Sequence, residues 1–191
     1  MPKAKITREM VVDAAFAVAR ESGAENVNAR TVAKRLSCST QPVMYHFERI
    51  EELKRAVYEK ADRFHTEYLM TLDDPGRGIL LGIGLNYIRF AIREPYLFRL
   101  LFQSGYAVGN SLPEAVESEA LSPLLAMMGE AMGTNPAGTK EVFMTLALLA
   151  HGYASLVANR ALPYDEASVA EELERVYRGA ILALKEERQN V

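Results

Sequence analysis

The residues best suited to act on a partner molecule lie in one short stretch, residues 39–47, and they carry hydrogen-bonding groups. Val43 and Phe47 are four residues apart, as on one face of a helix, so the other residues of the stretch are left for the opposite face. Hydroxyl and amide side chains can pair with base edges, while phenol and imidazole groups and the amides of a helix N-terminus suit phosphate oxygens. The residues expected on this outward face are Thr40, Gln41, Met44, Tyr45 and His46.

A second short helix is expected just before this stretch, separated from it by a polar turn. Its apolar residues Val32, Ala33 and Leu36 share one face. Ser39 is expected to be the N-cap of the following helix, which puts Pro42 at the third helical position, where its missing N–H has no partner within the helix. The pair predicts a DNA-reading helix-turn-helix, although a two-helix corner of any all-α protein can give the same pattern.

The N-terminal third of the chain resembles the tetracycline repressor (TetR) family of transcriptional regulators. The resemblance is carried by residues 7–23, by Arg-x-Val-Ala-x-x-Leu at 30–36, by Ser-x-x-x-Val-Met-Tyr-His-Phe at 39–47 and by Glu-Glu-Leu at 51–53. It implies a three-helix DNA-binding head, placed at residues 1–49, and a helical body, placed at residues 50–191, that dimerises and binds a small effector.

Two residues depart from the family pattern. The usual aromatic phosphate contact is Met44 here, and the usual lysine that opens the fourth helix is Ile50. Contacts to the DNA backbone are therefore expected to shift toward Tyr45, His46, Arg49 and Lys54. The expected DNA-binding set is Arg30, Thr40, Gln41 and Tyr45 on bases, Asn28, His46, Arg49 and Lys54 on phosphates, and Ser39 and Met44 beside them.

Charge is distributed unevenly along the chain. Residues 1–60 hold eleven Lys and Arg against eight Asp and Glu, a net charge of +3, whereas residues 61–191 hold eleven against seventeen, a net charge of −6, which together give −3. A basic head favours DNA phosphates through counterion release, and an acidic body keeps the rest of the protein off DNA. The same split can also be a solvated pattern without consequence.

The single cysteine, Cys38, cannot form an internal disulfide, and residues 1–3 are not followed by an apolar signal segment. No apolar run approaches the roughly 20 residues that a bilayer requires, so a cytoplasmic protein is expected. Cys38 is expected to behave as a small hydrophobic residue, with a role as an oxidation sensor as the alternative.

Apolar residues recur at helical spacing, and no β-branched run bounded by turn residues predicts a strand. The expected fold is all-α with about nine helices and a C-terminal helical bundle. Thr7 should cap the first helix and Gly23 close it. After the helix-turn-helix, helices are expected over residues 50–72, 79–93, from about 95, 113–132, 139–160 and 165–187, with breaks at 73–76, 103–112 and 133–138.

The last two helices predict a dimerisation unit, because the final helix has a wide apolar stripe and the preceding one has alanines that let backbones approach closely. Two such hairpins, one from each copy of the chain, would form a four-helix bundle. The apolar stripe of the final helix can equally pack against other helices of its own chain. A two-fold dimer would require a near-palindromic operator. The expected interface residues are Ala147, Ala154, Leu173, Val176, Tyr177, Ala180, Ile181 and Leu184.

An apolar or aromatic effector is expected among aromatic and methionine side chains of the body, which can equally be plain core. His151 is the polar contact expected there. An effector that prefers one separation of the heads would shift the population toward it and weaken DNA binding, with the fourth helix as the lever. The expected pocket residues are Phe64, Tyr68, Tyr87, Phe90, Phe98, Phe102, Met127, Phe143, Met144 and His151.

Enzymatic chemistry is not expected. The histidines at 46, 65 and 151 are far apart, and neither metal-ligand spacing nor a glycine-rich phosphate loop is present, so neither a metal nor another cofactor is expected. Two functions remain. One is a ligand-responsive DNA-binding repressor, and the other is a helical small-molecule-binding or adaptor protein that has lost operator binding.

Overall fold

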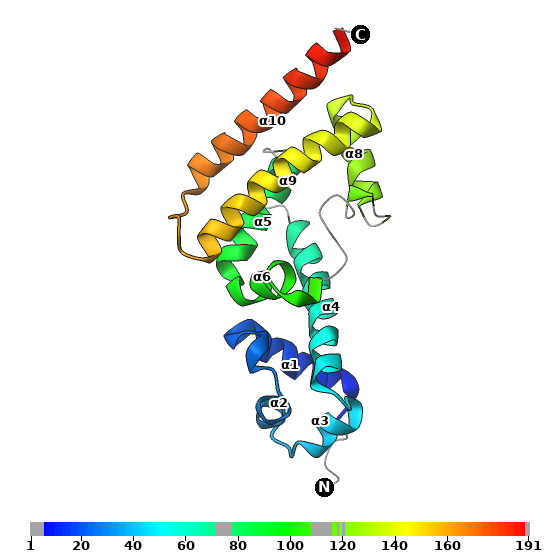
Figure 1. Cartoon of the computed structure of the whole chain (residues 1–191), viewed down its shortest axis with the longest axis vertical. Helices are drawn as coiled ribbons and strands as arrows, with labels where there is room; N and C mark the ends of the chain where they lie inside the picture. Colours follow the sequence, from blue (N-terminus) through cyan, green and yellow to red (C-terminus); the bar gives the residue numbers. More distant parts are fainter. Residues whose placement is uncertain (1–5, 72–77, 108–115, 118, 120, 190–191) are drawn as a thin grey trace. The chain divides into compact units, whose positions relative to one another are not determined.

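The computed structural model describes residues 6–71, 78–107, 116–117, 119 and 121–189, and over these residues the fold is all-α, as expected (Figure 1). The described part contains nine α-helices and no strand. The expected break at 73–76, the second half (108–112) of the loop expected at 103–112 and the start of the chain lie outside the described residues. The helices are α1 (Arg8–Ser22), α2 (Ala29–Arg35), α3 (Gln41–His46), α4 (Ile50–Leu69), α5 (Ile79–Arg93), α6 (Pro95–Phe102), α8 (Ser122–Met132), α9 (Pro136–Ala158) and α10 (Glu166–Gln189), with 3-10 turns at Ala24–Asn26 and Gly105–Ala107.

Contacts divide the chain into two compact units. Unit 1 comprises Met1–Tyr68 and Glu94–Ala107, and unit 2 comprises Leu69–Arg93 and Val108–Val191. Unit 1 therefore contains α6 as well as α1 to α3 and nearly all of α4. The sequence suggests a different boundary, at residue 50, between a DNA-binding head and a body that dimerises and binds an effector. This boundary separates functions rather than packing units, and it stays a prediction.

Unit 1 is held together by an apolar core to which each of its first four helices contributes. Val11, Val32, Val43 and Leu53 are all fully buried, at 0% exposure. The ends of α1 form as expected, since the Met10 N–H donates to Thr7 Oγ1 at 3.2 Å and Gly23 closes the helix with a φ of 99°. A positive φ of this kind is readily adopted only by glycine.

Polar contacts attach α6 to α1 within this unit. Arg20 binds the buried Glu94 with two hydrogen bonds, of which the bond from Nε to Oε2 is 2.7 Å long. His65 of α4 is also buried, and its ring meets Phe102 edge to face with centroids 5.2 Å apart. Burial lowers the pKa of His65 to about 4, so its ring is neutral near pH 7.

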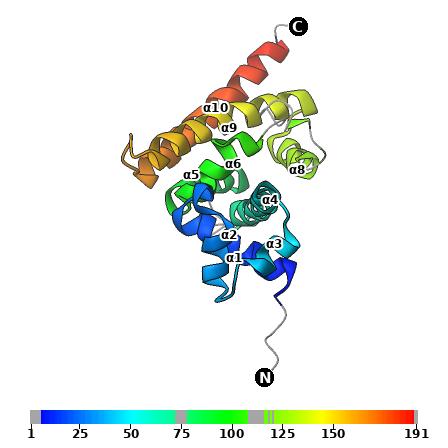
Figure 2. The same ribbon diagram turned by 60° about the horizontal axis from the view of Figure 1, so that its bottom comes forward.

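In unit 2 the central helix is α9, which contacts α5, α8 and α10. Phe90 of α5 and Ala154 of α9 are fully buried, and Leu173 brings α10 into the same core at 3% exposure. Both views show α9 and α10 side by side and running in opposite directions (Figures 1 and 2). The hairpin expected from the sequence is therefore present.

Several helix boundaries differ from expectation. α4 ends at Leu69 rather than at residue 72, and α8 begins at Ser122 rather than at residue 113, which lies outside the described residues. α9 begins three residues early, at Pro136, because Asn135 Oδ1 accepts the Gly138 N–H at 2.9 Å and caps the first turn. Proline is tolerated there, at the first helical position.

The expectation that no segment is long and apolar enough to cross a bilayer was wrong for α9. This helix has 23 residues and a mean hydropathy of 1.4 over an 18-residue window, which suffices by length and composition. A core helix packed between several neighbours meets the same criteria, and α9 contacts three other helices of unit 2. Its composition is therefore weak evidence for a membrane.

Candidate nucleic-acid interface

The start of α2 is fixed by its own side chains. Asn28 Oδ1 accepts hydrogen bonds from the N–H groups of Arg30 and Thr31 at 3.0 and 3.1 Å, and Thr31 Oγ1 accepts the Asn28 N–H at 3.1 Å. This reciprocal pair satisfies amides that have no partner within the helix. The asparagine three residues before a threonine is a signal visible in the sequence.

The turn between α2 and α3 is a tight C-terminal cap. The Ser37 N–H donates to the Lys34 carbonyl at 3.2 Å, and the Cys38 N–H donates to the Ala33 carbonyl at 3.0 Å. This pair of bonds requires a left-handed residue between the helix and the following chain, and Ser37 occupies that position with a φ of 52°. The angle between the two helices is thus set by backbone hydrogen bonds rather than by a flexible linker.

The stretch around α3 buries the two residues expected to face inward and exposes four of the five expected to face outward, while the fifth, His46, is half-buried. Val43 and Phe47 are buried, whereas Tyr45 is 79% exposed and Met44 is 42% exposed. Thr40 and Gln41 are exposed as well. A helix with this distribution presents one face to solvent and anchors the other.

The prediction that Ser39 is the N-cap of α3 is wrong. The N-cap position is Thr40, whose backbone is already helical at φ −70° and ψ −15° and whose side chain makes no capping bond. The first helical hydrogen bond accordingly runs from the Met44 N–H to the Thr40 carbonyl, at 3.0 Å. Pro42 becomes the second helical residue, still within the turn where a missing N–H costs no helix bond.

Three residues expected on phosphates have structural partners. His46 Nε2 lies 2.9 Å from the Ile6 carbonyl, which accepts its proton, so only Nδ1 is left to face another group. Asn28 uses both ends of its amide within the chain, because Nδ2 also donates to the Asn26 carbonyl at 3.2 Å. Lys54 is 3.6 Å from Glu51 Oε1 and only 19% of its side chain is exposed.

Three exposed cations around α2 and α3 have no acidic partner within the described part of the chain: Arg30, Lys34 and Arg49. Arg30 and Arg49 were expected at the interface. Lys34 was not expected at the interface. It lies in the last turn of α2, and its exposure could have been inferred because Val32 and Ala33 beside it take the buried face of the helix. Unpaired cations are the groups that displace counterions from DNA phosphates.

The residues expected to form an effector pocket are divided between the units. In unit 1, Phe98 is fully buried, with its ring 5.1 Å from that of Phe102, and Phe64 meets Phe16 edge to face at 5.8 Å. Each of these three rings thus has at least one aromatic partner inside unit 1. The division is Phe64, Tyr68, Phe98 and Phe102 in unit 1, and Tyr87, Phe90, Met127, Phe143, Met144 and His151 in unit 2.

In unit 2, both ring nitrogens of His151 lie within hydrogen-bonding distance of another side chain. Tyr87 Oη lies 2.9 Å from His151 Nδ1, and Ser155 Oγ lies 3.3 Å from Nε2. Burial lowers the pKa of His151 and raises the pKa of Tyr87, so both groups are neutral near pH 7. Phe143 and Met144 instead pack against the cluster that Val116, Leu125 and Met128 form.

A partly open cavity of about 340 Å³ also lies in unit 2, along α8 and α9. Its wall includes the ion pair of Lys140 with Glu117, at 2.6 Å. No residue expected in the effector pocket lines it. The lining residues are Val116, Glu117, Ser122, Leu125, Ala126, Gly129, Glu130, Thr134, Pro136, Thr139 and Lys140.

Three residues of the expected dimer interface are instead buried within the same chain. Ala154, Leu173 and Leu184 have exposures of 0, 3 and 9%. A Cβ added at Gly138 would meet Leu184 at 3.0 Å, so this glycine allows α10 to approach closely, whereas a Cβ added at Gly84 would make only an ordinary contact with Leu173, at 3.5 Å. The other expected residues, Ala147, Val176, Tyr177, Ala180 and Ile181, are half-buried.

Both helices of the hairpin nevertheless expose apolar residues that sequence reasoning missed, and we call these residues the exposed apolar face. On α9 it comprises Leu148, Gly152 and Leu156, each four residues from the next, with the two leucines 58 and 48% exposed. On α10 it comprises Gly179 and Leu182, and Leu182 is 59% exposed. A Cβ added at either glycine would meet nothing within 4 Å.

Comparison with known families identifies the class of protein. Residues 80–179, just over half of the chain, match the tetracyclin repressor-like, C-terminal domain. The chain belongs to the tetracyclin repressor-like family. The matched residues cover most of unit 2 and exclude the helix-turn-helix, so this match is independent of the resemblance seen in the first third of the sequence. The protein is thus a TetR-like transcriptional regulator, from a family that is generally non-enzymatic.

Solved structures agree with this fold. One of them, a TetR-like transcriptional regulator from Rhodococcus sp. RHA1, superposes with a TM-score of 0.60 at 17% sequence identity, covering 93% of this chain and 96% of that chain. At that identity the likeness concerns the fold. A comparison with curated proteins found no match.

Proposed function

We propose that this TetR-like protein is a cytoplasmic, homodimeric repressor that binds a near-palindromic DNA operator and is released from it by a small-molecule effector. One observation carries the DNA-binding part. α3 exposes Gln41, Met44 and Tyr45 on a helix whose Val43 is fully buried and whose preceding turn is fixed by backbone hydrogen bonds. A solvent-facing, rigidly anchored helix of this kind suits the major groove.

We assign the contacts from exposure and partners. Arg30, Thr40, Gln41 and Tyr45 read base edges, because they are exposed and their side chains have hydrogen-bonding groups. Arg49 and Lys34 hold phosphates, because they are exposed cations without an acidic partner in the described structure. Asn28, His46 and Lys54 position these groups, and His46 Nδ1 remains available to a phosphate.

The dimer is proposed to form through the exposed apolar face of α9 and α10. Leucines that are about half exposed, together with glycines that leave open space, allow a second copy to pack closely. Leu182→Ala should weaken the dimer and Leu182→Glu should give a monomer in sedimentation experiments, with unchanged circular dichroism as the control for folding. A dimer that survives Leu182→Glu would exclude this face.

The effector is proposed to be a small apolar or aromatic molecule bound by unit 2, with the pair of Tyr87 and His151 as its polar contact. These side chains are neutral and already hydrogen-bonded to each other, so a ligand with one donor or acceptor can replace one partner. Screening aromatic acids and amines for displacement of bound DNA tests this. If a compound displaces DNA equally well from the wild type, from Tyr87→Phe and from His151→Phe, this pair of residues is not the polar contact of the effector.

Selection of bound sequences from random DNA tests the operator. An inverted repeat is expected, with affinity that falls steeply with salt. Gln41→Ala should relax specificity at one base position by about 1 to 3 kcal/mol, whereas Arg49→Ala should weaken all sequences alike. Arg63→Ala is the matched control, because Arg63 is an exposed arginine in the second half of α4.

The second candidate function, a small-molecule-binding or adaptor protein without an operator, makes the opposite prediction. Met44 and Ile50 stand where the family has an aromatic phosphate contact and a lysine, which favours weaker DNA binding. If a folded, dimeric wild-type protein retains no DNA even at low salt, the repressor proposal is wrong and this second candidate is supported.

A further inference from the structure

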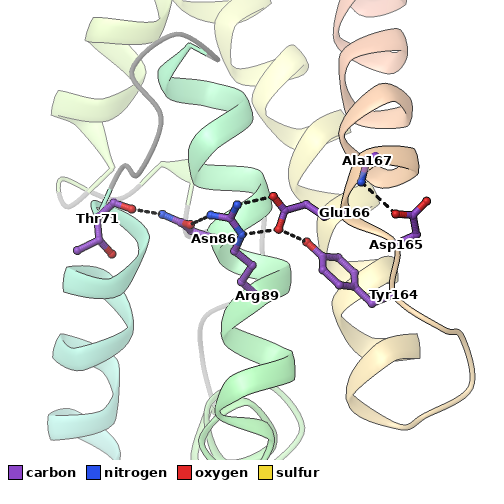
Figure 3. A network of polar contacts seen from close by, with 7 residues as sticks. All are labelled: Thr71, Asn86, Arg89, Tyr164, Asp165, Glu166 and Ala167. Carbon is purple, nitrogen blue, oxygen red and sulfur yellow. Dashed lines mark hydrogen bonds and ion pairs between the residues drawn. The ribbon is translucent and has the colours of Figure 1, made fainter.

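A chain of polar side chains crosses unit 2 from the end of α4 to the start of α10 (Figure 3). Its members are Asn86 and Arg89 of α5 and Glu166 of α10, which we call the polar relay. The hydrogen bonds that define the relay join residues of unit 2, because Leu69, the last residue of α4, belongs to that unit. The rest of α4 belongs to unit 1.

Asn86 forms the first half of the relay. It is a buried polar residue, at 3% exposure, and its Nδ2 donates to the carbonyls of Leu69 at 3.2 Å and Thr71 at 2.5 Å. The last carbonyls of a helix have no partner within the helix, so a side chain from another element must satisfy them when they are buried. Asn86 therefore caps α4 from α5.

Arg89 forms the second half. Its Nη1 donates to Asn86 Oδ1 at 3.0 Å, and its guanidinium binds Glu166 through two bonds, 2.8 Å from Nε to Oε2 and 2.5 Å from Nη2 to Oε1. Tyr164 adds a hydrogen bond to Glu166 Oε2 at 3.2 Å. Two parallel bonds between guanidinium and carboxylate fix orientation as well as distance. Each link of the relay thus restricts the next one.

We propose that Asn86 and Arg89 are positioning residues for DNA binding, because the relay holds the end of α4 in a fixed geometry to α10. This inference rests on the proposed function. α4 is one continuous helix that follows α3 after three residues, and α10 contributes Leu182 to the proposed dimer face. The relay therefore links α10, which carries part of the proposed dimer face, to the C-terminal end of α4, and a change at Asn86 or Arg89 is expected to alter which operators the dimer accepts.

Hydrogen exchange tests the relay without DNA. Asn86→Asp keeps an acceptor for Arg89 but removes the donor to the Leu69 and Thr71 carbonyls, so exchange in residues 66–71 should rise roughly tenfold. Glu166→Gln acts at the far end and should still raise exchange in residues 66–71 by at least about twofold. Glu172→Gln is the matched control, because Glu172 of α10 pairs with Arg175 and not with the relay. Unchanged exchange at 66–71 in Glu166→Gln overturns the relay.

Operator selection then tests positioning. The wild-type dimer should select one half-site spacing, and Asn86→Asp should select a broader range of spacings. Val142→Ala controls for stability alone, because Val142 is a fully buried residue of α9 outside the relay, and this variant should keep the wild-type spacing. If the wild type selects no DNA, the proposed function fails, whereas one identical spacing for the wild type and Asn86→Asp overturns the positioning role alone.

Discussion

Acidification should destabilise the protein through His65. This residue of α4 is 7% exposed, and burial lowers its pKa to about 4. In the unfolded chain a histidine has a pKa of about 6.5. The folded state thus binds the proton more weakly, so the stability is fully present above the unfolded pKa and is lost as the pH falls toward the folded one. Between pH 8 and pH 5 the two values give a loss of about 2 kcal/mol, approaching a limit of about 3 kcal/mol at lower pH.

Urea titrations of the wild type and of His65→Gln at pH 8 and pH 5 measure this loss. Other titrating groups, His151 included, are common to both proteins and cancel in the comparison. The wild type should lose about 2 kcal/mol more than the variant. Imidazole NMR signals give a second measurement, in which His65 should stay neutral well below pH 6. An equal pH dependence for the two proteins, or a His65 ring that titrates near 6.5, would refute the reasoning from burial.

Three further substitutions in unit 1 can be measured by urea unfolding. Ser37→Gly should raise the free energy of unfolding by about 0.5 to 1 kcal/mol, because the left-handed backbone there favours glycine, whereas Ser37→Ala should bring no gain. Asn28→Ala should lower it by about 1 kcal/mol through loss of the α2 cap, and a neutral result would exclude that role. Glu94→Gln should lower it by about 1 to 2 kcal/mol, less than for a fully buried pair because nearly half of the Arg20 side chain is exposed. Stability that is unaffected by Glu94→Gln would show that the pair contributes nothing.

The helix-turn-helix could be predicted because its signals are local. The spacing of Val32, Ala33, Val43 and Phe47 alone places these residues inward, and the structure buries all of them. The cap of α1 by Thr7 likewise depends on neighbours three residues away. Such patterns need no knowledge of the rest of the chain.

Partners distant in sequence could not be predicted. His46 looked free to meet a phosphate, yet its Nε2 binds the Ile6 carbonyl, 40 residues away. Arg20 and Glu94 are 74 residues apart, and nothing in either local sequence points to the other. Which polar side chains are available to DNA therefore depends on which ones the fold has already engaged.

The sequence by itself determined the all-α class, the helix-turn-helix and the apolar character of the last two helices, because helical periodicity and capping act over a few residues. Only the tertiary structure decided which side of that hairpin is covered. Leu173 and Leu184 pack inward against glycines of their own chain, whereas Leu148 and Leu182 stay exposed. Both sides of these helices are apolar, so periodicity cannot distinguish them, and the choice is made by the shape of the surfaces that meet.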